Sequence, residues 1–214
     1  MWFIPVIRPL AILGTAALAL TLLGPVAPVW TQDAPPTSGK RAPPTPSLPK
    51  TPAERDRTLS DLYALLATAE DENKAKVIAV DIERIWLHSG SPTVDLLLGR
   101  AMQAVSDKNF DRALKLFDHI VEQAPDFTEG WSRRAYVHFQ RNQVALTLGD
   151  LRRALALDPN HFKTLDGLAQ VLREIGQKKG ALEVVRQLHD VHPYWPGVGQ
   201  AIEELSREVE GQGI

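Results

Sequence analysis

Six histidines are the side chains in this sequence most able to bind a metal or to transfer a proton near neutral pH. They are His88, His119, His138, His161, His189 and His192. The last two lie three residues apart at the end of an expected helix, where the helix dipole favours histidine. A metal centre needs further ligands at matching spacing, and none stands nearby. We therefore expect no metal site.

Other catalytic patterns are also missing from the sequence. It contains no cysteine, which excludes disulfides, thiol catalysis, thiolate zinc sites and a cysteine-linked lipid anchor. It contains no Gly-x-Ser-x-Gly elbow, no Gly-x-x-x-x-Gly-Lys phosphate loop and no Gly-x-Gly-x-x-Gly motif. The carboxylates are scattered along expected solvated helix faces. The sequence thus predicts a protein that is not an enzyme and that uses no cofactor.

The composition narrows the kinds of partner. The chain has 214 residues, 44% of them apolar, with 24 Lys plus Arg against 26 Asp plus Glu and a net charge of −2. This apolar content supports one hydrophobic core. Nucleic-acid binding calls for a clustered excess of basic residues, which the chain lacks. We expect a protein or peptide partner and no nucleic acid.

The N-terminal segment, residues 1–31, has the pattern of an export signal. Arg8 precedes an apolar run that ends near Gly24, which is about the length of a secretory signal core and shorter than the roughly 20 residues that span a bilayer. The best cleavage point lies before Gln32. Inclusion of residues 25–30 would lengthen the run to spanning size, so an uncleaved membrane anchor is the alternative. The proline-rich residues 32–51 are expected to form a disordered linker.

A period of 34 residues organises the remainder of the chain. Pro125, Pro159 and Pro193 follow this period, and small residues recur on it at two other places. A repeat of this length is typical of a solenoid built from pairs of antiparallel helices, in which small residues allow close helix approach and each proline ends a helix. The aligned small residues are Ala101, Ala135 and Ala169, and then Ala113, Thr147 and Ala181.

At these residues the sequence resembles the tetratricopeptide repeat (TPR) family. The second repeat follows the family pattern through Trp131, Ala135, Thr147, Leu151, Ala154 and Pro159. The resemblance implies an all-α, right-handed α-solenoid with repeats at 94–127, 128–161 and 162–195. Arg100 and Arg134 depart from the pattern because the family usually has leucine there. We expect either looser packing at these positions or guanidinium groups that point outward.

Two flanking segments complete the expected array. Residues 52–93 form a helix pair that matches the repeat frame only in part, through Tyr63, Ala67 and Ala79. Because terminal repeats of a solenoid are atypical, we interpret this pair as a divergent repeat that caps the first repeat. Residues 196–210 have apolar positions at helical spacing and are expected to form a C-terminal capping helix.

In the resembled family, the first helices of successive repeats line a groove that receives an extended peptide or a helix. Projection of this frame predicts a groove that is apolar at its start and polar at its end. The alternative is that Tyr136 and Phe139 only pack between neighbouring helices. The predicted groove residues are Leu98, Met102, Val105, Tyr136, Phe139, Gln140, Lys163, Asp166, Gln170 and Arg173.

The sequence therefore predicts an exported, non-catalytic interaction scaffold or adaptor of a bacterial cell envelope, located in the periplasm. The alternative is a structural subunit, anchored in the inner membrane and facing the periplasm, that organises an envelope complex by self-association. Membrane contact is expected only through residues 1–31, and only if they are not cleaved.

Overall fold

The computed structural model describes residues 48–49 and 51–211, and over these residues it contains nine helices and no strand. The predicted signal segment and most of the predicted linker lie outside the described residues. The helices belong to one unit of the chain, Thr45–Ile214. They are α1 (Pro52–Ala67), α2 (Glu72–Trp86), α3 (Pro92–Ser106), α4 (Phe110–Gln123), α5 (Thr128–Gln140), α6 (Val144–Leu157), α7 (Phe162–Glu174), α8 (Lys178–Val191) and α9 (Val198–Glu210).

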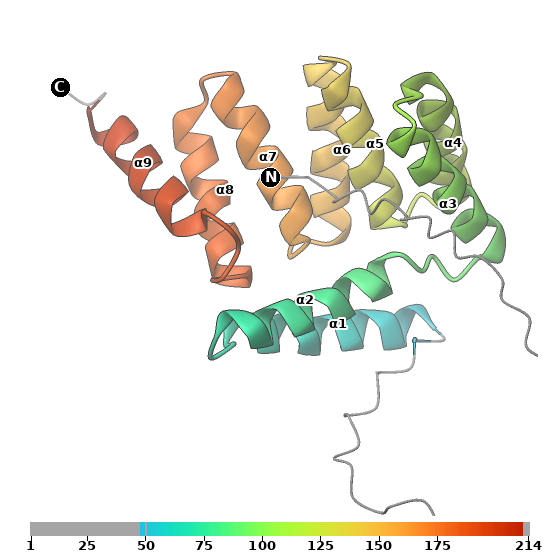
Figure 1. Cartoon of the computed structure of the whole chain (residues 1–214), viewed down its shortest axis with the longest axis horizontal. Helices are drawn as coiled ribbons and strands as arrows, with labels where there is room; N and C mark the ends of the chain where they lie inside the picture. Colours follow the sequence, from blue (N-terminus) through green and yellow to red (C-terminus); the bar gives the residue numbers. More distant parts are fainter. Residues whose placement is uncertain (1–47, 50, 212–214) are drawn as a thin grey trace, which may run out of the picture. The chain divides into compact units, whose positions relative to one another are not determined.

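Helices α3 to α8 form three consecutive pairs, and each pair packs against the next (Figure 1). Pro125 and Pro159 lie in the connections from one pair to the next, and Pro193 lies in the connection from α8 to α9. All six aligned small residues are buried, from Ala101 to Ala181, so the two helices of each pair approach closely as the period predicts. The all-α repeat fold is thus confirmed.

The turn inside each pair also repeats. Lys108, Asn142 and Gly176 follow the 34-residue period, and each has a positive φ of 56° to 76°. A left-handed residue after a helix lets the following backbone amides bond to carbonyls of its last turn. The amide of Asn109, for example, donates to the carbonyl of Ala104 at 2.8 Å. The repeat therefore extends to backbone conformation.

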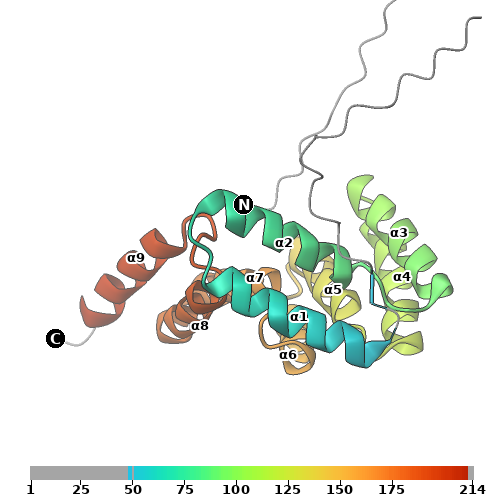
Figure 2. The ribbon, with the colours of Figure 1, turned by 90° about the horizontal axis from the view of Figure 1, so that it is seen from below.

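The α1–α2 pair does not occupy the position that the sequence indicated. Its buried side chains form one hydrophobic cluster with those of α7, α8 and α9, whereas those of α3 and α4 belong to a separate cluster. Figures 1 and 2 show the pair lying across the ends of the later helices. Helix α1 contacts α8, and the hydroxyl of Tyr194 donates to the carbonyl of Glu70 at 3.0 Å. The prediction that this pair caps the first repeat was wrong.

The surface of α3 explains this difference. Leu96 has 56% of its surface exposed, whereas the residues one and two periods later, Gly130 and Thr164, are buried. Gln103 is also exposed, and its counterparts Val137 and Val171 are buried. The face of α3 that would meet a preceding repeat is thus exposed and not covered by another helix pair. The apolar face of the α1–α2 pair finds its partners in the third repeat instead.

Of the two departures from the family pattern, Arg100 is exposed on α3, whereas Arg134 lies in the second repeat. Arg134 does not point freely outward, because it donates two hydrogen bonds to Asp150, at 2.7 and 2.8 Å, and one to Asp118 at 2.8 Å. Trp131 is only half-buried: its indole N–H donates to the carbonyl of Pro125 at 3.1 Å, and the Arg134 guanidinium lies 4.9 Å from its ring centroid. The Arg134 guanidinium thus links α5 to Asp118 of α4 and Asp150 of α6, at a position where the TPR family usually has leucine.

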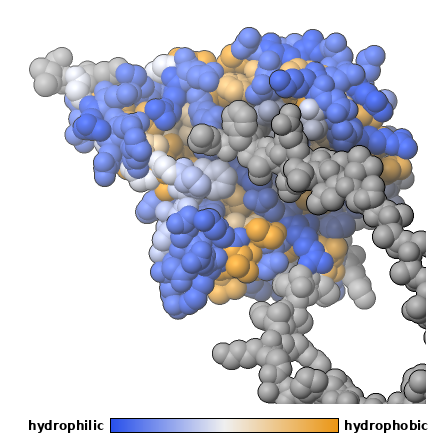
Figure 3. Space-filling view, viewed as in Figure 1, coloured by the Kyte–Doolittle hydropathy of each residue, from blue (hydrophilic) through white to orange (hydrophobic). Residues whose placement is uncertain are grey.

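The exterior is mainly hydrophilic on the face shown in Figure 3, with apolar patches between. The most exposed large apolar residues are Val77 and Val80 on the outer face of α2, at 66% and 63%. Of the helices that the structure describes, none combines the length and the apolar character that a membrane crossing requires.

Candidate functional site: the predicted groove and the α1–α2 junction

The apolar residues of the predicted groove come from α3 and α5. Met102, Val105 and Tyr136 are half-buried and pack against one hydrophobic cluster, and Phe139 is half-buried against the neighbouring cluster. Gln140, at the end of α5, is exposed. These side chains have one part in the core and another part at the surface, so both groove lining and helix packing are compatible with their burial.

Leu98 does not line a surface. It is 2% exposed and belongs to the cluster formed by the first repeat. Its assignment as a groove residue was therefore wrong. The counterpart one period later, Ser132, is buried as well, so this position of the first helix faces the core and not the groove in both repeats.

The polar residues of the predicted groove already have partners within the chain. The Lys163 ammonium lies 2.6 Å from Glu83 of α2, and the Arg173 guanidinium lies 3.6 Å from Glu204 of α9. Gln170 donates to Asp166 at 3.0 Å. Burial raises the pKa of Asp166, although hydrogen bonds from Trp195 and Gln170 oppose the shift. A partner protein can bind these groups only if their present hydrogen bonds and ion pairs within the chain break or are shared with the partner.

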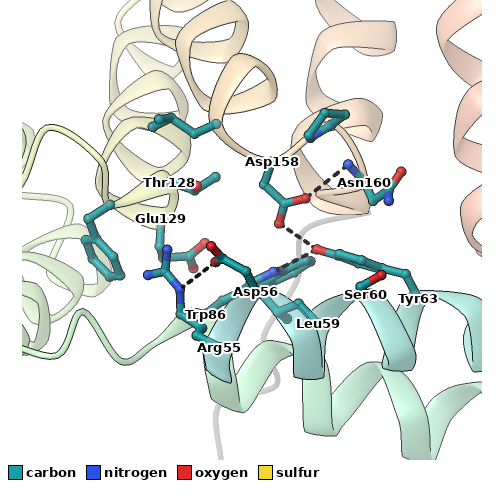
Figure 4. A pocket seen from close by; sticks show the side chains of 13 residues that line it. Arg55, Asp56, Leu59, Ser60, Tyr63, Trp86, Thr128, Glu129, Asp158 and Asn160 are labelled. Atoms are coloured by element: carbon teal, nitrogen blue, oxygen red, sulfur yellow. Dashed lines mark hydrogen bonds and ion pairs between the residues drawn. The ribbon is translucent and has the colours of Figure 1, made fainter. Parts of the chain in front are cut away.

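A cavity of about 200 Å³ lies where the α1–α2 pair meets the repeats (Figure 4). One side is formed by α1 and the end of α2, and the other by the α4–α5 and α6–α7 connections. The hydroxyl of Tyr63 donates to Asp158 at 2.6 Å and accepts the indole N–H of Trp86 at 3.0 Å. Burial and the Asp158 carboxylate raise the pKa of Tyr63 far above its usual value, so it stays a neutral donor.

A buried polar network continues from this cavity into the array. His161 Nε2 lies 3.0 Å from Glu129, and its Nδ1 accepts the backbone N–H of Thr164 at 3.3 Å. Arg133 donates to the other Glu129 oxygen at 2.5 Å. Burial alone would raise the pKa of Glu129, but the charge of Arg133 and the hydrogen bonds from His161 and Arg133 lower it to about 2. The carboxylate is thus fixed in its charged form.

His192 occupies a different environment beside this network. Its ring packs edge-on against Phe162 and Trp195, with centroids 5.3 and 5.6 Å away, and its buried Nδ1 has no hydrogen-bond partner among the described residues. Burial lowers the pKa of His192 to about 4. The ring is therefore neutral near pH 7.

The sequence alone did not identify this junction. Glu129 lies one 34-residue period before Lys163, which the frame placed in the groove. The same frame could therefore have indicated Glu129 as a site residue. Tyr63 and Trp86 gave no such signal, because their partners belong to distant repeats. Over the described residues, no group of three or more His, Asp or Glu side chains is arranged to hold a metal ion.

Comparisons with known proteins agree with the repeat pattern. The chain is 29% identical over 153 residues to a TPR repeat-containing protein of Rhizobium etli, and the match covers 72% of this chain and 75% of that protein. No family model matches the chain.

Solved structures resemble the fold at lower sequence identity. The Sgt2 TPR domain from Aspergillus fumigatus is 20% identical, with a TM-score of 0.52, over 57% of this chain and 83% of that one. The first TPR of Spaghetti (RPAP3), bound to the HSP90 peptide SRMEEVD, is 14% identical, with a TM-score of 0.52, over 55% of this chain and 93% of that one. Together with the 34-residue pattern, the stacked helix pairs and the similarity to the Rhizobium protein, these likenesses show that the chain has the helical repeat fold of TPR domains.

Proposed function

We propose that this chain is a non-catalytic protein-interaction scaffold that binds a segment of a partner protein along Met102, Val105, Tyr136 and Phe139. The observation that carries the proposal is that these four apolar side chains, from the first helices of two consecutive repeats, remain partly exposed. Aromatic side chains and methionine are common at the centres of protein interfaces and on adaptable apolar surfaces.

The pairing of the polar groove residues indicates the chemistry of the partner. Lys163 and Arg173 are engaged by Glu83 and Glu204, so new ion pairs at this end would add little free energy. Binding then depends on apolar contact, which suits the apolar face of an amphipathic helix or an extended apolar peptide. The peptide held by the TPR of Spaghetti supports a peptide ligand for this fold.

A site-specific crosslinking experiment tests the location. A photoreactive amino acid at Gln140, which is exposed beside Phe139, should crosslink a partner in extracts of the source cells. The control is the same group at Leu146, 53% exposed on α6. Crosslinked products that are specific to position 140 support the proposal. Equal products at both positions, or none at position 140, would contradict it.

We further propose that the scaffold acts in the bacterial cell envelope, on the periplasmic side. Support comes from residues 1–31, whose single basic residue and apolar run have the pattern of an export signal. Fractionation and intact-mass measurement test this proposal. A periplasmic chain that begins near Gln32 is the expected result. A full-length chain in the membrane pellet would show that residues 1–31 are kept as a membrane anchor and are not cleaved. A full-length chain in the cytoplasm would contradict export.

A further inference from the structure

We propose that this chain forms a weak dimer with two-fold symmetry, in which the outer faces of α2 from two copies pack antiparallel. This surface is separate from the predicted groove and does not depend on it. At its centre are Val77 and Val80, which are 66% and 63% exposed. No other large apolar side chain of the described residues is as exposed. Figure 3 shows apolar surface on the α1–α2 pair.

Helix α2 has apolar residues on two opposite faces. One face is buried in the core, through Ala79 and Ile82 among others. The outer face has four exposed residues, spaced four, three and four positions apart: Asn73, Val77, Val80 and Arg84. This spacing places the four side chains in one stripe, as in the seam between two helices of a coiled coil. A helix that only closes the core needs no valine at these two outer positions.

The stripe is complementary to a second copy of itself when the two helices run antiparallel. A two-fold axis between residues 78 and 79 places Val77 of each copy against Val80 of the other, and Asn73 against Arg84. The Asn73 amide oxygen then accepts a hydrogen bond from the Arg84 guanidinium. In a parallel pair, equal positions would meet and the two Arg84 side chains would repel each other. The ends of the stripe therefore favour the antiparallel arrangement.

The charges beside the stripe are complementary in the same arrangement. Lys74 and Asp81 lie seven residues apart and so share one edge of the stripe. The two-fold axis places this edge against the same edge of the second copy in the reverse direction, so each Lys74 meets the other copy's Asp81. Lys74 also pairs with Glu70 within α2, but this exposed ion pair contributes little free energy and leaves the ammonium able to contact a second carboxylate.

The same charges favour a second copy over a membrane surface. A helix face that binds anionic lipids carries basic residues around its apolar side chains, whereas Asp81 lies directly beside Val77 and Val80 on this face. One pair of helices of this length buries less than the roughly 1,200 to 2,000 Å² of a stable interface. We therefore expect a dimer that forms at high protein concentration.

Sedimentation equilibrium of the whole chain, over about a hundredfold range of concentration, measures the association. The average mass should rise from that of one copy toward that of two. Val80→Asp should abolish this rise, because it places a charge in the apolar centre of the interface. The control is Leu146→Asp on α6, where the parent leucine is 53% exposed, and it should associate normally. A parent chain that stays monomeric, or a rise that Val80→Asp leaves unchanged, would overturn the inference.

An exchange of charges tests the antiparallel contact itself. Lys74→Glu and Asp81→Lys should each weaken self-association about fivefold or more, because each variant brings two pairs of like charges together. An equimolar mixture of the two variants should associate as tightly as the parent chain, since the carboxylate introduced at position 74 then meets the lysine introduced at position 81. Failure of the mixture to recover would overturn the inference. The Tyr136→Ser/Phe139→Ser variant should dimerise normally, which separates a failure here from a failure of the groove proposal.

Discussion

The rings of Trp86 and His161 lie face to face, with centroids 3.7 Å apart and planes 15° apart. Trp86 ends α2, and His161 precedes α7, where its Nδ1 caps the helix by accepting the Thr164 amide. The other ring nitrogen lies beside Glu129 of the second repeat. This stack therefore joins the α1–α2 pair to two repeats, and makes the pair part of the folded array.

The first prediction concerns this contact. Trp86→Ala should lower the free energy of unfolding by about 3 to 5 kcal/mol, because it removes a buried aromatic side chain and leaves a void between the α1–α2 pair and the third repeat. Chemical denaturation measures the loss. Val80→Ala, on the exposed outer face of the same helix, should change stability by less than about 0.5 kcal/mol. Equal effects of the two variants would mean that the pair does not dock as described.

Replacement of Gly130 and of Gly99 by alanine should change the stability of the chain in opposite directions. A Cβ at Gly130 would lie 2.8 Å from a methyl carbon of Ile120, so Gly130→Ala should destabilise the contact between the first and second repeats. Gly99, in α3, has nothing within 4 Å of the same position. Gly99→Ala should therefore stabilise by about 0.5 to 1 kcal/mol through helix propensity. Thermal melting of both variants would test the packing of α5 against α4.

The stability of the chain should depend on pH through His192. Its pKa is about 4 in the folded chain and near 6.5 when unfolded, so the unfolded state binds a proton first as the pH falls. The contribution of a neutral His192 is complete above pH 6.5 and is lost as the pH falls toward 4. Replacement by Leu should flatten the pH dependence of unfolding over this range. The exposed His189, changed to Gln, is the control, and the same slope in both variants would refute the assignment.

Much of the repeat architecture follows from the sequence because its determinants are local. The small residues at Ala101, Ala135 and Ala169 recur at a fixed spacing, and each is buried between the helices of its own pair. The left-handed turn residues Asn142 and Gly176 repeat for the same reason. Neighbouring repeats make similar contacts, so one period predicts them all.

The docking of α1–α2 could not be predicted in this way. Its anchors, the hydrogen bond from Tyr63 to Asp158 and the ion pair of Glu83 with Lys163, link residues far apart in sequence and occur once. The repeat frame matched the α1–α2 pair to a repeat through Ala67 and Ala79. It contained no information on which face of the repeat array would pack against the pair. Leu98 was misplaced because the projected frame assigned it to the groove, whereas its position on the first helix faces the core.

The most direct test of the proposed function measures the affinity of the crosslinked partner for the Tyr136→Ser/Phe139→Ser variant, with Leu146→Ser as the control. If the groove binds the partner, the double variant should keep the circular dichroism spectrum and cooperative melting of the parent chain and lose roughly 2 kcal/mol or more of binding free energy, whereas the control should bind normally. Unfolding of the double variant would show that the two aromatic residues only pack between helices. A folded double variant with unchanged affinity would contradict the account.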